Sequence, residues 1–166
     1  MAKTQKQISK KEAIIKAQNL CAYQEKCEAD IRQKLYAWKT NPKDIDNIIE
    51  QLINDQFIDD QRFAISFAKE KFRFNRWGKI KIEYALKQKR IGIEFISKAI
   101  QGISENDYDS VLLNELNKKY LLLKESDEYT IKSKLIRYAL SKGYENGKVF
   151  DMVSKVIENN KKDFIK

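Results

Sequence analysis

The chain has 166 residues and a formal net charge of +9, with 33 Lys and Arg against 24 Asp and Glu, and it contains no histidine. The missing histidine excludes Ser-His and Cys-His nucleophilic catalysis and histidine metal sites. One proline and five glycines are too few breakers for many strands and tight turns, so the composition predicts an all-α protein. The positive excess suggests a polyanionic partner, either nucleic acid or an acidic protein surface.

The polar N-terminal stretch and the two cysteines add little chemistry. No apolar segment follows MAKTQKQISK, and the longest aliphatic run, 121–123, is far shorter than the roughly 20 residues of a membrane span. We therefore expect a cytoplasmic protein without a membrane segment. Cys21 and Cys27 cannot form a zinc site alone, and we interpret them as small buried or half-buried residues.

Helix-start signals recur along the chain and predict about nine helices. A capping residue followed by an acidic residue marks a helix N-terminus. The cap accepts hydrogen bonds from free backbone N–H groups, and the positive end of the helix dipole stabilises the acidic side chain. Gly143 indicates a helix C-terminus. The predicted caps are Ser9 (with Glu12), Asn41 (before Pro42, with Asp44), Asp59 (before Asp60) and Ser104 (with Asp107).

A threefold repeat of apolar positions is anchored on Leu35, Leu86 and Leu140. An apolar residue stands four residues before each anchor, and others stand ten, thirteen and seventeen residues after it. The ten-residue step across the turn between two helices is therefore the same in all three segments. This predicts three stacked three-helix modules in an elongated, curved array, at 9–56, 59–103 and 104–160, followed by a tail at 161–166. The other repeat positions are Ile31, Ile45, Ile48, Leu52; Ile82, Ile96, Ala99, Ile103; and Ile136, Phe150, Val153, Ile157.

The stretch FIDDQRFA places two adjacent carboxylates, Asp59 and Asp60, between the first two modules. A metal-dependent nuclease using them with Glu70 is one hypothesis, but adjacent helical residues point about 100° apart and cannot share one face. We therefore expect Asp59 to cap the following helix and Asp60 to favour its dipole, with no catalytic residue, metal or cofactor. For Arg62 we favour a structural ion pair, with partner contact as the alternative.

Most of the positive excess lies between residues 69 and 90, where the sequence has nine basic residues and only two acidic ones, Glu70 and Glu83. This concentration favours a binding surface over lysines that merely solvate two helices. The aromatic residues within it (Phe72, Phe74, Trp77 and Tyr84) are expected in the core more than in contact with bases. The candidate partner-binding residues are Arg62, Lys69, Lys71, Arg73, Arg76, Lys79, Lys81, Lys87, Lys89 and Arg90.

Four segments of the chain resemble the RecX regulatory proteins: FIDDQRFA, WGKIKIEYAL with KQKRIGIEFISKAI, KCEADIRQKL, and IRYALSKGYENGKVFDMV. The resemblance covers roughly residues 11–158. Three positions depart from the family pattern. Lys81 occupies the position of an arginine, Arg90 that of the glycine in a helix-ending turn, and Cys27 that of a capping serine. Arg90 makes that turn less certain, because a left-handed conformation is costly without glycine.

The resemblance implies a non-enzymatic regulator of the RecA recombinase, acting in homologous recombination, DNA repair and the SOS response. Such a protein would bind the RecA filament on single-stranded DNA and inhibit ATP hydrolysis, strand exchange and co-protease activity. A stand-alone helical DNA-binding protein is the alternative, although no recognition helix rich in Arg, Asn and Gln is present. The sequence leaves the oligomeric state open, and a monomer is the working expectation.

Overall fold

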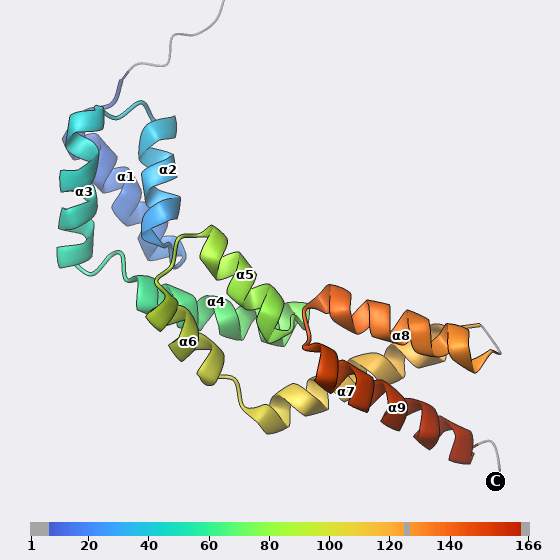
Figure 1. Ribbon diagram of the computed structural model, residues 1–166. Coiled ribbons are helices and arrows are strands. Elements are labelled where there is room, and N and C mark those ends of the chain that lie inside the picture. Colours follow the sequence, from blue (N-terminus) through green and yellow to red (C-terminus); the bar gives the residue numbers. More distant parts are fainter. Residues whose placement is uncertain (1–6, 125–126, 164–166) are drawn as a thin grey trace, which may run out of the picture. The chain divides into compact units, whose positions relative to one another are not determined.

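The computed structural model describes residues 7–124 and 127–163, and within these ranges it contains nine α-helices and no strand (Figure 1). The prediction of an all-α protein is confirmed. None of the described helices is both long and apolar enough to cross a bilayer. The helices are α1 (Lys10–Tyr23), α2 (Glu28–Ala37), α3 (Pro42–Asn54), α4 (Asp60–Asn75), α5 (Lys79–Gln88), α6 (Ile93–Gln101), α7 (Glu105–Leu122), α8 (Glu128–Lys142) and α9 (Asn146–Asp163).

Side-chain caps begin several of these helices. Each cap accepts a hydrogen bond from a backbone N–H two or three residues further on, which satisfies one of the donors that a helix N-terminus leaves free. They are Ser9 (from Glu12 N–H, 3.2 Å), Asn41 (from Lys43 N–H, 3.1 Å), Ser104 (from Asp107 N–H, 3.4 Å) and Asp127 (from Thr130 N–H, 2.8 Å).

The chain divides into two compact units, each with its own core. The first runs to Ser66 and takes in Leu86–Ser97, and the second comprises Phe67–Ala85 and the chain from Lys98. In the first unit, α1, α2 and α3 pack pairwise around buried aliphatic side chains such as Ile31, Ile48 and Leu52 (Figure 1). The threefold division predicted from the repeat stays a prediction, and residues 164–166 of the predicted tail lie outside the described residues.

The second unit has an aromatic centre. Its helices α7, α8 and α9 pack pairwise, and the fully buried Tyr108 lies between Phe72 (ring centroids 5.8 Å apart) and Tyr144 (5.0 Å). The Tyr108 hydroxyl donates to Glu145 (2.6 Å) and accepts from the Lys79 N–H (2.9 Å), so this buried phenol is satisfied. Burial, reinforced by the Glu145 carboxylate, raises the pKa of Tyr108.

The repeat predicted from sequence is right in its first two segments and wrong by one residue in the third. Leu140 is 38% exposed and Phe150 is 48% exposed, whereas Ala139 is buried. Val153 and Ile157 of the predicted set are buried, but only the anchor at Ala139 makes every position of the third segment buried. The other four positions are then Leu135, Val149, Met152 and Val156. Both Ala139 and Leu140 are apolar, so the pattern alone does not show which of these neighbours is the core residue.

The corrected anchors also share one helix-ending turn. The backbone N–H five residues after Leu35, Leu86 and Ala139 donates to the anchor carbonyl at 3.1, 3.2 and 3.3 Å. The residue four after each anchor has a positive φ of 56° (Lys39), 58° (Arg90) or 90° (Gly143). Arg90 therefore adopts the left-handed conformation without glycine, at a cost of about 1 kcal/mol.

Gly78 and Gly143 let two backbones approach closely within the second unit. A Cβ on Gly78 would lie 2.2 Å from the Gly143 carbonyl oxygen, and one on Gly143 would lie 2.3 Å from the Lys81 Cβ. The Gly78 and Ile80 N–H groups at the start of α5 donate to the carbonyls of Lys142 (2.8 Å) and Gly143 (3.1 Å) at the end of α8. The C-terminus of one helix thus satisfies the N-terminus of another.

Candidate partner-binding surface

Asp59 begins α4 as a side-chain cap. Its Oδ1 accepts from the Arg62 N–H at 2.8 Å, three residues on, in the usual cap geometry. The preceding Ile58 is buried against the core of the first unit, so the chain enters α4 from a fixed point. One of the two carboxylates in FIDDQRFA is therefore used by the helix that it precedes.

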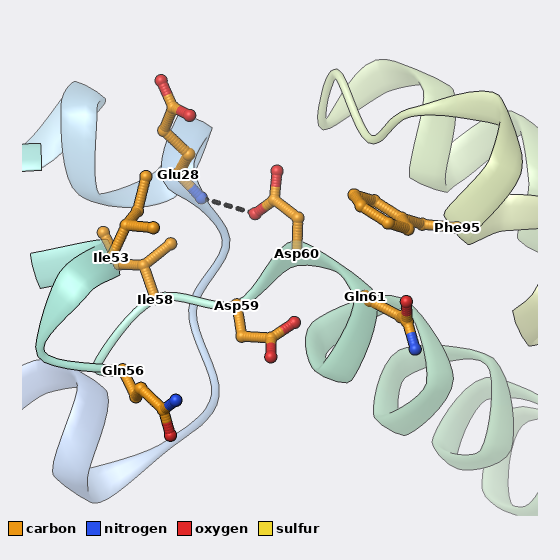
Figure 2. A pocket seen from close by; sticks show the side chains of 8 residues that line it. All are labelled: Glu28, Ile53, Gln56, Ile58, Asp59, Asp60, Gln61 and Phe95. Carbon is orange, nitrogen blue, oxygen red and sulfur yellow. Dashed lines mark hydrogen bonds between the residues drawn. The ribbon is translucent and has the colours of Figure 1, made fainter. Parts of the chain in front are cut away.

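Asp60 serves a different helix. Its Oδ1 accepts from the Glu28 N–H at 2.9 Å, at the start of α2 (Figure 2). The N-cap of α2 is Cys27, which makes no side-chain cap bond, so Asp60 supplies the acceptor that this cap lacks. Burial raises the pKa of the Asp60 carboxyl. Burial likewise raises the pKa of the Cys27 thiol to about 12.

Arg62 makes an ion pair within the first unit. Its Nε donates to Glu25 Oε1 at 2.7 Å and its Nη2 to the Gln56 carbonyl at 3.1 Å. Gln56 has a positive φ of 61° at the end of α3, and the guanidinium holds that turn against α4. The side chain, although 42% exposed, is thus paired within the chain, as the structural alternative for Arg62 expects.

A hollow of about 360 Å³ lies beside this junction. Its walls combine acidic and apolar side chains from the first unit (Figure 2). The carboxylates are already committed: Asp59 and Asp60 accept from backbone N–H groups, and Glu28 pairs with Arg32 at 2.8 Å. Within the described ranges no three His, Cys, Asp or Glu residues gather as a metal site. The three carboxylates of this hollow thus all have structural partners within the first unit.

Four of the predicted basic residues hold the fold together. Lys79 forms an ion pair with Glu105 and lies over the Tyr108 ring, and only 15% of its side chain is exposed. Lys89 pairs with Asp30 at 2.8 Å. Lys81 donates to the Ser141 carbonyl (3.2 Å) and lies over the Trp77 ring, and Lys71 pairs with Glu70 (3.1 Å) and lies over Phe67 and Trp77.

Two of the other predicted basic residues present their charge to solvent. Lys69 and Arg73 lie one turn apart on α4 and are both exposed, and in the part of the chain that the structure describes neither has an ion-pair partner. Arg90 and Lys87 are also exposed. Arg76 is half-buried, with a φ of 57°, and its carbonyl accepts from the Tyr144 hydroxyl.

The basic window does not lie within one compact unit. Six of its nine basic residues, from Lys69 to Lys81, belong to the second unit, whereas Lys87, Lys89 and Arg90 belong to the first. Charge that is contiguous in sequence is therefore divided between two bodies. The candidate surface is best described unit by unit.

The expectation that the aromatic residues of this window are core is wrong for two of the four. Phe72 is buried and Trp77 is half-buried under two lysines, but Phe74 is 80% exposed and Tyr84 is 64% exposed. Phe74 follows Arg73 directly. The exposed part of the window thus contains aromatic as well as basic side chains, which are the components of single-strand binding surfaces.

Sequence reasoning missed the polar centre of the second unit. Tyr108 on α7 lies 37 residues before Glu145, and Lys148 forms ion pairs with Asp109 and Glu105 (3.4 Å). The hydrogen bonds with Lys79 and Lys148 lower the pKa of the Glu105 carboxyl. The one available signal is that Tyr108 falls at an apolar helix position four before Leu112.

Comparison with known proteins places the chain in a family. A family model described as the second three-helix domain of RecX matches residues 59–100. The regulatory protein RecX of Clostridium beijerinckii is 34% identical over 141 residues, which are 84% of this chain and 65% of that protein. Its counterpart in Clostridium botulinum Alaska E43 is 33% identical over 158 residues, 92% of this chain and 74% of that protein. This chain thus spans slightly less than two thirds of the length of the first relative.

Solved structures share the fold. A crystal structure of a regulatory protein RecX superposes with a TM-score of 0.80 at 23% identity, covering 88% of this chain and 71% of that one. RecX from Lactobacillus salivarius superposes with a TM-score of 0.76 at 19% identity, covering 90% and 95%. The sequence similarity to its relatives shows that this chain belongs to the RecX family of regulatory proteins, and its fold agrees with this assignment.

Proposed function

We propose that this protein binds the RecA recombinase and its filament on single-stranded DNA and inhibits ATP hydrolysis, strand exchange and co-protease activity. Membership of the RecX family and the basic charge of the chain support the proposal. The protein would act as a cytoplasmic monomer in recombination and repair, without catalysis or cofactor of its own. Its three modules would be 9–56, 59–103 and 104–160, a division supported by the thrice-repeated helix-ending turn.

The exposed basic face of α4 carries the proposed contact. The RecA filament on DNA is a polyanion, and exposed cations without internal partners can pair with it at no cost to the fold. Lys69 and Arg73 meet this condition within the described residues, and the exposed Phe74 adds apolar area beside them. By contrast, Lys79 and Lys89 are already paired inside the protein.

The test reverses charge only where the fold does not use it. Lys69→Glu combined with Arg73→Glu should abolish or strongly weaken inhibition of single-strand-dependent ATP hydrolysis by RecA, because two attractive contacts become repulsive. The measurement is the steady-state ATPase rate of the filament against regulator concentration, with circular dichroism to show that the variant stays helical.

The matched control makes the same change of charge elsewhere. Lys34→Glu with Lys43→Glu also replaces two exposed lysines of the first unit that have no ion-pair partner among the residues described. It should retain most of the inhibition. Equal loss in both variants would mean that only net charge matters, and full inhibition by the α4 variant would refute the proposed surface.

Binding experiments separate this proposal from a stand-alone DNA-binding protein. Affinity for bare single-stranded DNA is compared with affinity for the RecA filament over a range of salt concentrations. Preference for the filament is expected. Tight binding to bare DNA with no gain on the filament would favour the stand-alone alternative.

A further inference from the structure

The second unit has a basic hollow whose cationic lining residues are not among the candidate partner-binding residues of the sequence. A hollow of about 400 Å³ opens between α7 and α8, two helices that pack against each other (Figure 1). At the C-terminal end of α7 the lining residues are one turn apart, and on α8 they follow the spacing of a single helix face. They are Lys119 from α7, Leu123 from the C-cap that follows it, and Lys134, Arg137, Tyr138 and Ser141 from α8.

The lining carries three positive charges and no carboxylate. Arg137 is exposed and makes no ion pair with any residue that the structure describes, so its guanidinium donors are available to a ligand. A guanidinium presents a planar fork of donors that matches a phosphate or carboxylate in two-point fashion. Of the three cations, Arg137 is therefore the one best suited to direct recognition.

The Tyr138 ring contacts Lys119 of the lining and the neighbouring Lys142. The Lys119 and Lys142 ammonium groups lie 5.5 and 5.8 Å from its centroid. Its hydroxyl donates to Glu115 at 2.9 Å, and burial together with that carboxylate raises the pKa of Tyr138 to about 12. Glu115 also pairs with Lys118 at 3.7 Å.

The surrounding segment is basic as well. Between Lys118 and Lys142 the sequence has seven basic and three acidic residues, a net charge of +4. A cluster of three cations about a hollow lined by no carboxylate suits a polyanion with closely and regularly spaced charges, which a phosphodiester backbone provides. The scattered carboxylates of an acidic protein would pair with these cations less completely.

We propose that the hollow between α7 and α8 binds the phosphodiester backbone of single-stranded nucleic acid, with Arg137 as the principal phosphate contact. This deepens the proposed function and rests on it for the identity of the bound strand. It gives the protein a direct nucleic-acid contact in the second unit, independent of the Lys69 and Arg73 face of α4.

The test measures binding of the full chain to a short fluorescein-labelled oligothymidylate by anisotropy, without RecA. Arg137→Gln should weaken binding by about three- to tenfold and reduce the slope of log K against log salt by about 0.7, the value for one phosphate on a single strand. Arg137→Lys should keep the slope and recover part of the affinity, because it retains the charge and loses the fork.

Lys43→Gln is the matched control, since it removes one exposed charge from the first unit and should leave binding unchanged. Circular dichroism checks that each variant folds. Unchanged affinity of Arg137→Gln for the oligonucleotide would overturn the proposal. So would wild-type binding to labelled polyglutamate with none to oligothymidylate, which would point to an acidic protein instead.

A RecA ATPase assay keeps the two proposals apart. Failure of wild-type protein to inhibit the filament would refute the proposed function whatever the oligonucleotide shows. Normal inhibition by the wild type, together with an Arg137→Gln variant that binds oligothymidylate as the wild type does, would refute only the hollow as a nucleic-acid site.

Discussion

Asp59 and Asp60 are adjacent in sequence but stabilise different helices. Asp59 accepts from the Arg62 N–H in its own helix, whereas Asp60 accepts from the Glu28 N–H at the start of α2. The sequence predicts the first contact, because a cap and the N–H that it accepts lie only three residues apart. It does not predict the second, which joins residues 32 positions apart.

Replacing Asp60 tests its part in capping α2. Burial raises the pKa of the Asp60 carboxyl in the folded state above its value in the unfolded state. The carboxyl therefore favours the folded state at a pH below the unfolded pKa, where it is protonated. This contribution to stability is lost as the pH rises through the folded pKa. Asp60→Asn keeps an oxygen acceptor for Glu28 and removes the buried charge. We therefore expect it to gain stability relative to wild type at neutral pH, with the difference shrinking toward about pH 4.

Asp60→Ala is the contrasting variant, because it removes the acceptor itself and should cost about 1 kcal/mol. Urea unfolding at neutral and acidic pH measures both variants. If the two substitutions have equal effects, the hydrogen bond to Glu28 contributes nothing to the capping of α2.

At the scale of helices, the repeat is set by its turns as much as by its apolar faces. The helices α2, α5 and α8 each end with a residue in the left-handed conformation. The N–H of the next residue donates a hydrogen bond to the carbonyl of the anchor. Apolar periodicity alone allows a shift of one residue wherever two neighbouring positions are both hydrophobic, as at Ala139 and Leu140. The turn removes the ambiguity, since Gly143 must lie four residues after the anchor.

Truncation of single leucines tests the corrected register. Leu135→Ala should cost about 2 to 5 kcal/mol, because Leu135 is fully buried and its loss leaves a cavity. Leu140→Ala should cost less than about 1 kcal/mol, because its side chain is already partly exposed. Denaturant unfolding monitored by circular dichroism compares the two, and a costlier Leu140→Ala would restore the register predicted from sequence.

Over the whole molecule, a basic residue can serve either the fold or a partner. The window between Lys69 and Arg90 contains both kinds: Lys79 and Lys89 are paired with Glu105 and Asp30, whereas Lys69 and Arg73 face solvent. Net charge and sequence position do not distinguish them. A charge-reversal variant that includes Lys79 would change stability and binding together, so it would be a poor test of either.

Neutralising one lysine of each kind should separate the roles. Lys79→Gln removes an ion pair and the ammonium over Tyr108, so its melting temperature should fall by several degrees. Lys69→Gln should stay within about 0.5 kcal/mol of wild type, as surface substitutions usually do. Thermal unfolding followed by circular dichroism measures both, and equal melting temperatures would show that Lys79 has no structural role.

The sequence by itself determined the helical class, the starts of most helices and the family, because caps, periodicity and turn residues act over a few positions. It also located the basic window. Only the tertiary structure decided which cations are free, which aromatic side chains are exposed, and that the hollow between α7 and α8 exists. Those properties depend on residues that are distant in the chain, such as Lys79 with Glu105 or Lys119 with Arg137, and local patterns carry no information about which distant partners will meet.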